Sequence, residues 1–317
     1  MAEVSHTAIL GAGVIGASWA ALFLASGKSV AIYDPHTGAL DSVKRYVATA
    51  WPTLEALGLA NEGNPDAIES ATSARSAVEG ADFVQENVPE RLPIKHATFA
   101  EIEPALADHA VVASSASGLM LRQMQEGWRD PARFVLGHPF NPPHLIPLVE
   151  VLGNNRTDES AIQAAEAFYA SIGKVTIRLR KEKNGHVANR LQAALWREAI
   201  SLVGEGVASV EDVDKAVWAG PGLRWAAMGP TSLFNLGAGE GGLEAFIEHF
   251  AETFEGWWAE LGSPTFDTAT RELLLAGTEE ANAGRTHAAL ASQRDALILA
   301  LLTASKQVRD EKHSSPS

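Results

Sequence analysis

Short apolar runs alternate with amphipathic stretches over the first half of the chain. Runs of this kind are typical of strands buried on both faces, and the stretches between them repeat apolar residues at helical spacing. Strands that alternate with helices predict an α/β fold, in which helices wrap a parallel sheet. The predicted strands are Ala8–Leu10, Ser29–Tyr33, Ala81–Val88, Val111–Ala113, Phe134–Leu136, Leu148–Leu152 and Val175–Leu179.

The pattern changes near Gly185. Beyond this residue apolar positions recur at helical spacing, and no further strand is indicated. The sequence therefore predicts two domains, an α/β domain over residues 1–185 and an all-helical domain over residues 186–317. The polar tail from about residue 311 is expected to be disordered.

The first predicted strand ends in a glycine-rich turn that opens a helical stretch. This turn comprises Gly11, Ala12, Gly13, Val14, Ile15 and Gly16. Gly11 permits a tight turn, Gly13 lets the backbone approach a pyrophosphate, and Gly16 lets the helix pack on the strand. Free N–H groups at the start of the helix favour a phosphate there. The spacing G-x-G-x-x-G between strand and helix predicts a doubly wound, Rossmann-type dinucleotide-binding domain. A purely structural glycine turn is the alternative.

Asp34 ends the second predicted strand, about 20 residues after the glycines, where an acid binds the ribose hydroxyls of a dinucleotide. A carboxylate accepts hydrogen bonds from ribose but repels a 2′-phosphate, and the residues that follow it are Pro35 and His36 rather than arginine. The sequence thus predicts NAD as the cofactor in preference to NADP. FAD, which uses the same fingerprint, is the minor alternative.

Charge and composition narrow the class of protein. The chain has 317 residues and a formal net charge of −14, which argues against nucleic acid and anionic membranes as partners. It contains no cysteine, which excludes disulfides, thiolate catalysis and cysteine-ligated zinc, and we predict no metal site. The first strand begins almost at once and no long apolar run is present, so we expect no signal peptide, no membrane span and a cytoplasmic location.

A second group of candidate residues surrounds the strand that ends in Gly137-His138-Pro139. His138 follows an apolar strand, at the edge where a parallel sheet presents ligand-binding groups. Glu150 lies within another apolar strand and needs a partner, because an unpaired buried carboxylate is costly. The two residues fit a general base oriented by an acid. A structural histidine and a surface glutamate are the alternative.

Two further polar positions are candidates for substrate contact. Ser117 follows the strand Val111–Ala113 in a serine cluster, where a hydroxyl can contact nicotinamide or a substrate oxygen. Asn189 lies near the start of the first helix of the second domain and could donate to a substrate carbonyl. Ordinary turn serines and a helix-capping asparagine are the alternatives.

Together these residues resemble the 3-hydroxyacyl-CoA dehydrogenase family over about residues 5–245. The motifs are GAGVIG, Asp34, Pro89-Glu90 with Lys95, Ser115-Ala116-Ser117-Gly-Leu, GHPFNPPHLIPLVEV and Gly185-x-x-x-Asn189-Arg190-Leu191. The resemblance implies a Rossmann domain followed by a helical domain that forms a homodimer. It also implies that Ser117 and Asn189 bind the substrate oxygen, that His138 is the base paired with Glu150, and that Glu90 and Lys95 flank the nicotinamide and its ribose.

The chain departs from the family pattern at two places near the reacting groups. It has Ser115-Ala116-Ser117 where the family usually has Asn-Thr-Ser, and Asn184-Gly185-His186 where the family usually has Pro-Gly-Phe. Both departures, together with the acidic charge, argue against an acyl-CoA substrate, because CoA carries phosphates.

Within the family, the segment GPGLRWAAMG over residues 220–229 is most similar to the branch that acts on L-carnitine, and a related segment occurs in the L-gulonate 3-dehydrogenase and lambda-crystallin branch. The planar guanidinium of Arg224 can pair with a carboxylate, and Trp225 with Trp196 or Trp218 offers aromatic faces to a quaternary ammonium. Packing at a helix interface is the alternative for any one tryptophan.

We interpret the chain as an NAD-dependent dehydrogenase of a free 3-hydroxy acid, with L-carnitine as the leading substrate. L-gulonate or a small 3-hydroxyacyl-CoA is the alternative within the same chemistry. A non-catalytic NAD(H)-binding structural protein is the alternative from another class.

Overall fold

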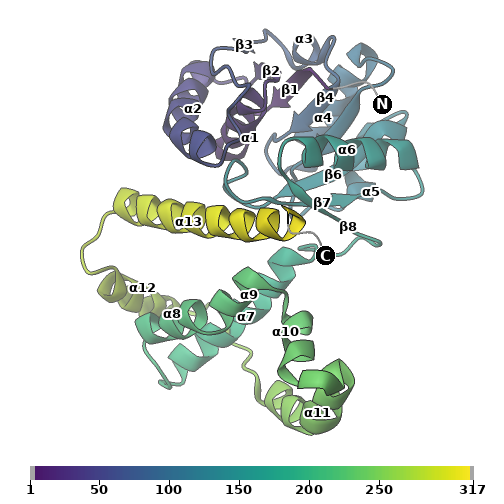
Figure 1. The fold of residues 1–317 in the computed structure, drawn as a ribbon. Coiled ribbons are helices and arrows are strands. Elements are labelled where there is room, and N and C mark those ends of the chain that lie inside the picture. Colours follow the sequence, from purple (N-terminus) through teal and green to yellow (C-terminus); the bar gives the residue numbers. More distant parts are fainter. Residues whose placement is uncertain (1–3, 315–317) are drawn as a thin grey trace. The chain divides into compact units, whose positions relative to one another are not determined.

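The computed structural model describes residues 4–314, which form two compact units that divide between Val187 and Ala188 (Figure 1). The first unit is built on a sheet and the second is helical, as the change of pattern near residue 185 predicts.

The first unit contains an eight-stranded sheet with the order β3-β2-β1-β4-β5-β6-β7-β8. The strands are β1 (His6–Leu10), β2 (Ser29–Tyr33), β3 (Ile68–Ser70), β4 (Phe83–Glu86), β5 (Val111–Ser114), β6 (Phe134–Pro139), β7 (Leu148–Leu152) and β8 (Val175–Arg178). Neighbouring strands are parallel except β6 and β7, which pair antiparallel. The predicted parallel sheet is therefore confirmed apart from this one pair. β3 was not predicted, because Ile68 alone of its residues is buried.

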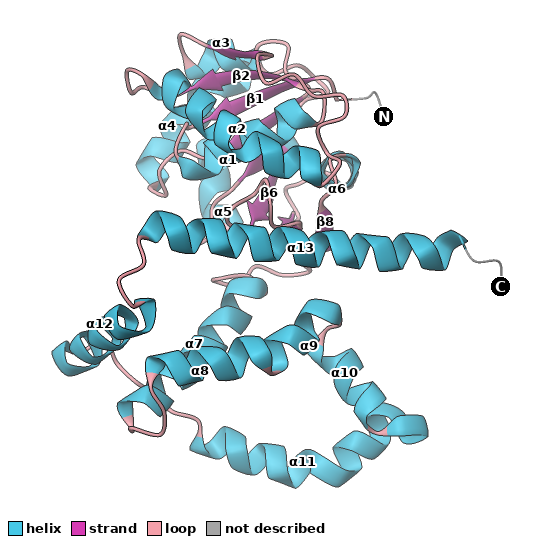
Figure 2. Ribbon diagram, turned by 60° about the vertical axis from the view of Figure 1, so that its left-hand side comes forward, coloured by secondary structure: helices cyan, strands magenta, loops and turns pink. Residues whose placement is uncertain are grey.

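Helices cover both faces of the sheet, which makes it doubly wound (Figure 1, Figure 2). They are α1 (Val14–Ala25), α2 (Ala39–Ala56), α3 (Ala74–Val78), α4 (Leu92–Ile102), α5 (Leu121–Met124) and α6 (Glu159–Ser171). One hydrophobic cluster joins α1, α2 and α6 to one face of the sheet, and a second cluster joins α3, α4 and α5 to the other face. The first half of the chain thus has the predicted α/β architecture.

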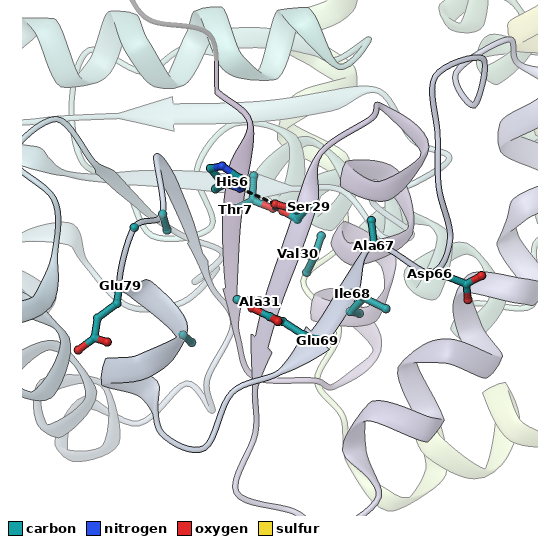
Figure 3. A pocket seen from close by; sticks show the side chains of 13 residues that line it. His6, Thr7, Ser29, Val30, Ala31, Asp66, Ala67, Ile68, Glu69 and Glu79 are labelled. Atoms are coloured by element: carbon teal, nitrogen blue, oxygen red, sulfur yellow. Dashed lines mark hydrogen bonds between the residues drawn. The ribbon is translucent and has the colours of Figure 1, made fainter.

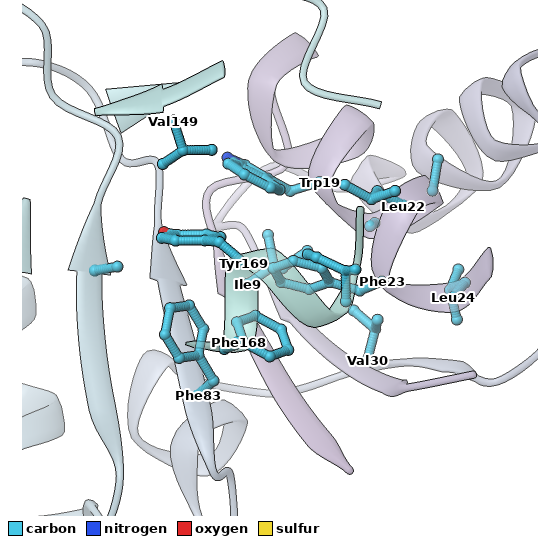
Figure 4. Packing of buried hydrophobic residues seen from close by; sticks show 14 of the residues in the cluster. Ile9, Trp19, Leu22, Phe23, Leu24, Val30, Phe83, Val149, Phe168 and Tyr169 are labelled. Atoms are coloured by element: carbon cyan, nitrogen blue, oxygen red, sulfur yellow. The ribbon is translucent and has the colours of Figure 1, made fainter. Parts of the chain in front are cut away.

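An aromatic group anchors α1 and α6 to the sheet (Figure 4). Trp19 of α1 stacks on Tyr169 of α6 with ring centroids 5.5 Å apart, and Phe83 of β4 lies 4.3 Å from Phe168. Trp19 and Tyr169 are fully buried. Truncating a buried aromatic side chain of this kind typically costs about 3–5 kcal/mol. The packing therefore holds α1, with the glycine turn before it, firmly against the sheet.

The second unit is formed of helices. They are α7 (Ala188–Gly204), α8 (Val210–Ala219), α9 (Pro221–Ala227), α10 (Pro230–Gly237), α11 (Gly242–Glu260), α12 (Thr268–Asn282) and α13 (His287–Ser314). Ser209 caps α8, since its Oγ accepts the N–H of Asp212 at 3.1 Å. The sequence predicts disorder from about residue 311, but α13 continues through residues 311–314. Strong helix formers such as Glu311 favour the helix there. Residues 315–317 of the predicted tail lie outside the described residues.

Over residues 4–314, no helix is both long and apolar enough to cross a bilayer. In the same part of the chain, no group of three or more His, Cys, Asp or Glu side chains is arranged to hold a metal ion. The location in the cytoplasm stays a prediction.

Candidate active site

The glycine turn between β1 and α1 has the geometry that its sequence predicts. Gly11 has a φ of +90°, and a Cβ there would lie 2.6 Å from the carbonyl oxygen of Asn87. A Cβ at Gly16 would overlap the carbonyl oxygen of Gly11, so only glycine lets the helix lie this close to the turn. Gly13, the N-cap of α1, has open space where its Cβ would be. The turn thus leaves room for a pyrophosphate at the positive end of a helix.

Asp34 follows β2 at the same edge of the sheet as the glycine turn. Its Oδ2 accepts the N–H of Ala12 at 2.8 Å, and its Oδ1 accepts the N–H of His36 at 2.9 Å. Burial raises the pKa of Asp34, but these hydrogen bonds outweigh burial and hold the pKa below its ordinary value. A charged carboxylate therefore stands beside the glycine turn, at the position where the sequence predicts a contact with the ribose.

We expect Asp34→Ala to lower kcat/KM for NAD by about 10- to 100-fold, because hydrogen bonds to a charged group contribute about 1.5–3 kcal/mol. The preference for NAD over NADP should narrow as the repulsion disappears. Asp34→Asn is the matched control, since its amide oxygen can still accept the N–H of Ala12. Steady-state kinetics with both cofactors measure the change, and a wild-type enzyme that prefers NADP would contradict the assignment.

Glu90, in the connection between β4 and α4, contacts Ser117 in the loop after β5. The carboxylate of Glu90 accepts the N–H groups of Ser117 at 2.7 Å, Gly118 at 2.5 Å and Leu119 at 3.2 Å. The Oγ of Ser117 also donates to Glu90, at 3.2 Å. Burial raises the pKa of Glu90, but the three backbone donors outweigh it and keep the pKa low. A predicted cofactor residue and a predicted substrate residue, from two different loops, are thus joined by hydrogen bonds.

Lys95 lies behind this loop rather than in an open site. Its side chain is 1% exposed, and its Nζ donates to both oxygens of Glu86, at 2.6 and 2.8 Å, and to the carbonyl of Val88 at 3.1 Å. An ammonium has three N–H donors, and protein acceptors take all of them. In this structure Lys95 thus holds the turn between β4 and α4, and its predicted place beside the nicotinamide and its ribose stays a prediction.

His138 and Glu150 face one another across the antiparallel pair of β6 and β7, where they are register partners. The Nδ1 of His138 lies 2.9 Å from Glu150 Oε2, and Glu150 Oε1 accepts the N–H of Val187 at 2.9 Å. Both side chains are buried. Because the carboxylate only accepts, Nδ1 carries the hydrogen and Nε2 presents its lone pair. This tautomer is the one that a general base requires.

The connection between β6 and β7 is anchored to the rest of the domain. Lys174, 7% exposed, donates from Nζ to the carbonyls of Pro143 and Ile146, and lies 5.2 Å from the centre of the Trp19 ring. Burial lowers the pKa of Lys174 to about 7. The N–H of His144 is held by the Oγ of Ser18 at 2.8 Å. These contacts fix the segment that separates His138 from Glu150.

His186 joins this group, although the sequence marks it only as a departure from the family pattern. Its ring centroid lies 5.1 Å from that of His138, and its Nε2 lies 3.4 Å from the carbonyl oxygen of Ala116. Burial lowers the pKa of His186, and the neighbouring His138 lowers it further. A histidine directly after a glycine at the predicted domain junction is the signal that could have identified it.

The remaining predicted substrate residues belong to the helical unit. Asn189 is half-buried in the first turn of α7, and Trp196 of the same helix packs on Phe266 with centroids 5.5 Å apart. Arg224 and Trp225 are exposed neighbours in α9. Their roles in binding substrate stay predictions.

A cavity of about 650 Å³ lies at the opposite edge of the sheet, beside the amino ends of β1 and β2 (Figure 3). His6, Ser29 and Asp66 are among its lining residues, and the predicted site residues are not. Because cofactors bind at the carboxyl edge of such sheets, this cavity is separate from the candidate site.

The open glycine turn, the charged Asp34 and the buried histidine–carboxylate pair share the carboxyl edge, and these residues fit a bound NAD. They define an NAD-dependent dehydrogenase that acts on a CH–OH group. Comparison of the sequence with known families specifies this class further. The model of the 3-hydroxyacyl-CoA dehydrogenase NAD binding domain matches residues 6–183, and that of the 3-hydroxyacyl-CoA dehydrogenase C-terminal domain matches residues 185–274. The chain belongs to the 3-hydroxyacyl-CoA dehydrogenase family.

Several relatives match almost the whole chain. An L-carnitine dehydrogenase from Streptomyces griseus is 44% identical over 302 residues, which cover 95% of this chain and 90% of that protein. An L-carnitine dehydrogenase from Pseudomonas putida is 40% identical over 304 residues, which cover 96% of this chain and 95% of that protein.

Solved structures share the fold. The NAD-dependent dismutase 5-formyl-3-hydroxy-2-methylpyridine 4-carboxylic acid 5-dehydrogenase is 26% identical with a TM-score of 0.81, over 96% of this chain and 99% of that chain. A diketoreductase is 26% identical with a TM-score of 0.63, over 80% of this chain and 93% of that chain.

Proposed function

We propose that this protein oxidises L-carnitine to 3-dehydrocarnitine with NAD. The observation that carries the proposal is the 44% identity to an L-carnitine dehydrogenase, which extends through both the sheet domain and the helical domain. The reaction converts L-carnitine and NAD⁺ to 3-dehydrocarnitine, NADH and a proton. Bound NAD supplies the acceptor for the hydride that leaves C3.

His138 is the proposed general base of this reaction. Its Nε2 takes the proton of the C3 hydroxyl, while Glu150 stabilises the imidazolium that forms and holds the ring by its Nδ1. Glu150 is itself held by the N–H of Val187, so the base has a fixed orientation. Ser117 and Asn189 are the proposed donors to the substrate oxygen, and the Oγ of Ser117 must turn from Glu90 to donate to it.

The two charged ends of carnitine require different partners. Arg224 offers guanidinium N–H groups to the carboxylate in a charge-assisted pair. The indole faces of Trp225 and Trp196 are suited to the trimethylammonium group, which has no hydrogen-bond donor. Both indoles are partly exposed, with 41% and 54% of their surface accessible.

A panel of substrates tests this assignment. We expect NADH formation with L-carnitine to exceed that with L-gulonate and 3-hydroxybutyryl-CoA. In the isostere 3-hydroxy-5,5-dimethylhexanoate, a neutral tert-butyl group replaces the trimethylammonium group. It should bind several-fold to tens-fold worse, because it loses a cation–π contact of about 0.5–2 kcal/mol. Arg224→Met should raise KM for carnitine by about 10- to 100-fold through loss of a charged hydrogen bond. Arg294→Met, another exposed arginine of the helical unit, is the matched control. Turnover of gulonate without turnover of carnitine would overturn the substrate assignment.

We further propose that the helical unit forms a homodimer. Among its described side chains, those of Ile200, Ser201, Val203 and Val213 are buried. Large apolar side chains are exposed instead, including Leu275 at 72%, Trp218 at 67% and Trp258 at 63%. Exposed apolar surface on this scale marks an interface. Sedimentation equilibrium should give the mass of two chains at micromolar concentration, and a monomer under these conditions would contradict the proposal.

A further inference from the structure

His186 is held in an unfavourable state beside the proposed base. Its φ is +49°, in the left-handed region that non-glycine residues rarely adopt. Its imidazole is 4% exposed, and within the described part of the chain its Nδ1 has no hydrogen-bond partner. A buried nitrogen without a partner destabilises a fold. Unsatisfied and strained groups of this kind cluster at functional sites.

The free nitrogen of His186 is an acceptor. Its Nε2 lies 3.4 Å from the carbonyl oxygen of Ala116, which can only accept, so Nε2 carries the hydrogen and Nδ1 presents a lone pair. Burial and the neighbouring His138 both favour the neutral ring. The ligand that satisfies Nδ1 must therefore bring an N–H or O–H donor.

The reactants offer few such donors near His138. A base and a hydride acceptor act on adjacent atoms of one C–O bond, so the reactive carbon of the nicotinamide must lie within a few ångströms of the atoms that His138 contacts. The reacting hydroxyl gives its single proton to His138. Carnitine carries no second donor, because its ammonium is quaternary and its other end is a carboxylate. The nicotinamide ribose also carries hydroxyl donors, but it is attached at the ring nitrogen, opposite the reactive carbon. The carboxamide, one ring carbon away from the reactive carbon, is the nearer donor.

We propose that the Nδ1 of His186 accepts a hydrogen bond from the carboxamide N–H of bound NAD and so fixes the orientation of the nicotinamide ring. The inference rests on the proposed function of His138 as the base beside the nicotinamide. His186 is joined to that site on two sides, through Ala116 next to Ser117 and through Val187, whose N–H holds Glu150.

A cofactor analogue that lacks the donor tests the proposal without turnover. Reduced 3-acetylpyridine adenine dinucleotide carries an acetyl group where NADH carries the carboxamide. Calorimetric titration without substrate gives the dissociation constants of both cofactors for the wild type and for His186→Phe, which keeps a ring of similar size. We divide the dissociation constant of the analogue by that of NADH. This ratio should be about 3- to 10-fold larger in the wild type than in the variant, because one neutral hydrogen bond contributes that much to binding.

Two variants control for indirect effects. His186→Ala removes the nitrogen without adding bulk, and it should lower the ratio to the same value as His186→Phe does. His109→Phe changes an exposed histidine, paired with Asp82, and should keep the wild-type ratio.

Equal ratios in the wild type and both His186 variants would overturn the inference while leaving the proposed function intact. The same holds if the variants raise KM for carnitine and leave the ratio unchanged, since Nδ1 would then bind the substrate. A wild-type protein that fails to bind NADH would overturn the proposed function as well.

Discussion

Replacing His138 with alanine should lower kcat by about 10²–10⁴-fold, which is the usual contribution of a positioned general base. Glu150 holds the Nδ1 of His138 at 2.9 Å and so fixes the orientation of the ring. A water molecule that fills the space in the alanine variant is not oriented in this way. Binding of NADH should remain nearly intact, because the glycine turn and Asp34 adjoin β1, α1 and β2 rather than the β6–β7 pair. Steady-state turnover of carnitine and fluorescence titration with NADH measure the two effects separately.

The alanine variant leaves Glu150 buried without its histidine partner, which can destabilise the domain. His138→Gln avoids this, since its amide can donate toward Glu150 but has no basic nitrogen. Both variants should lose turnover, whereas His109→Ala at the surface should not. Activity within a few-fold of the wild type in His138→Gln would remove His138 from the mechanism.

The glycine turn and every strand except β3 could be predicted because each depends on local sequence. An apolar run of the right length and a glycine at a fixed spacing have few alternative structures. The direction of β7 could not be read from its own residues, because a strand buried on both faces looks the same in either direction. The length of the connection over residues 140–147 indicates the antiparallel direction. It is shorter than the dozen or so residues that a parallel crossover needs.

The candidate site was predictable where one physical rule applied to one residue. Glu150 stands in an apolar strand and had to find a partner, which led to His138. The same rule applies to Glu86 in β4, where it leads to the buried pair with Lys95. The association of Glu90 with residues 117–119 depends on how two loops meet, which no local pattern encodes.

The register of β6 and β7 has a consequence for the chemistry of the site. Directly opposed residues on an antiparallel pair project to the same face, so His138 and Glu150 meet without help from a flexible loop. The other oxygen of the Glu150 carboxylate accepts a hydrogen bond from the N–H of Val187. The proposed base, held by two strands and a backbone donor, is thus preorganised before substrate arrives.

Replacing Glu150 with glutamine should lower kcat by roughly 10²–10⁴-fold, about as much as removing the proposed base does. The N–H of Val187 requires an acceptor and keeps the amide oxygen on its side. The amide NH₂ group then faces Nδ1 of His138, which must present a lone pair to it. The hydrogen moves to Nε2, and the atom that should accept the hydroxyl proton becomes a donor. Glutamine thus keeps the shape of the site and reverses the tautomer of its base.

Two further variants separate this effect from a general loss of structure. Glu159→Gln removes a carboxylate that pairs with Arg178 at the surface and should leave turnover unchanged. Glu150→Asp keeps the charge on a shorter side chain, so it should retain the correct tautomer and more activity than the glutamine variant. Thermal unfolding and NADH titration show whether each variant folds and binds cofactor. Near-normal turnover in a folded Glu150→Gln protein would show that the carboxylate does not set the tautomer of His138, and the base would have to be sought elsewhere.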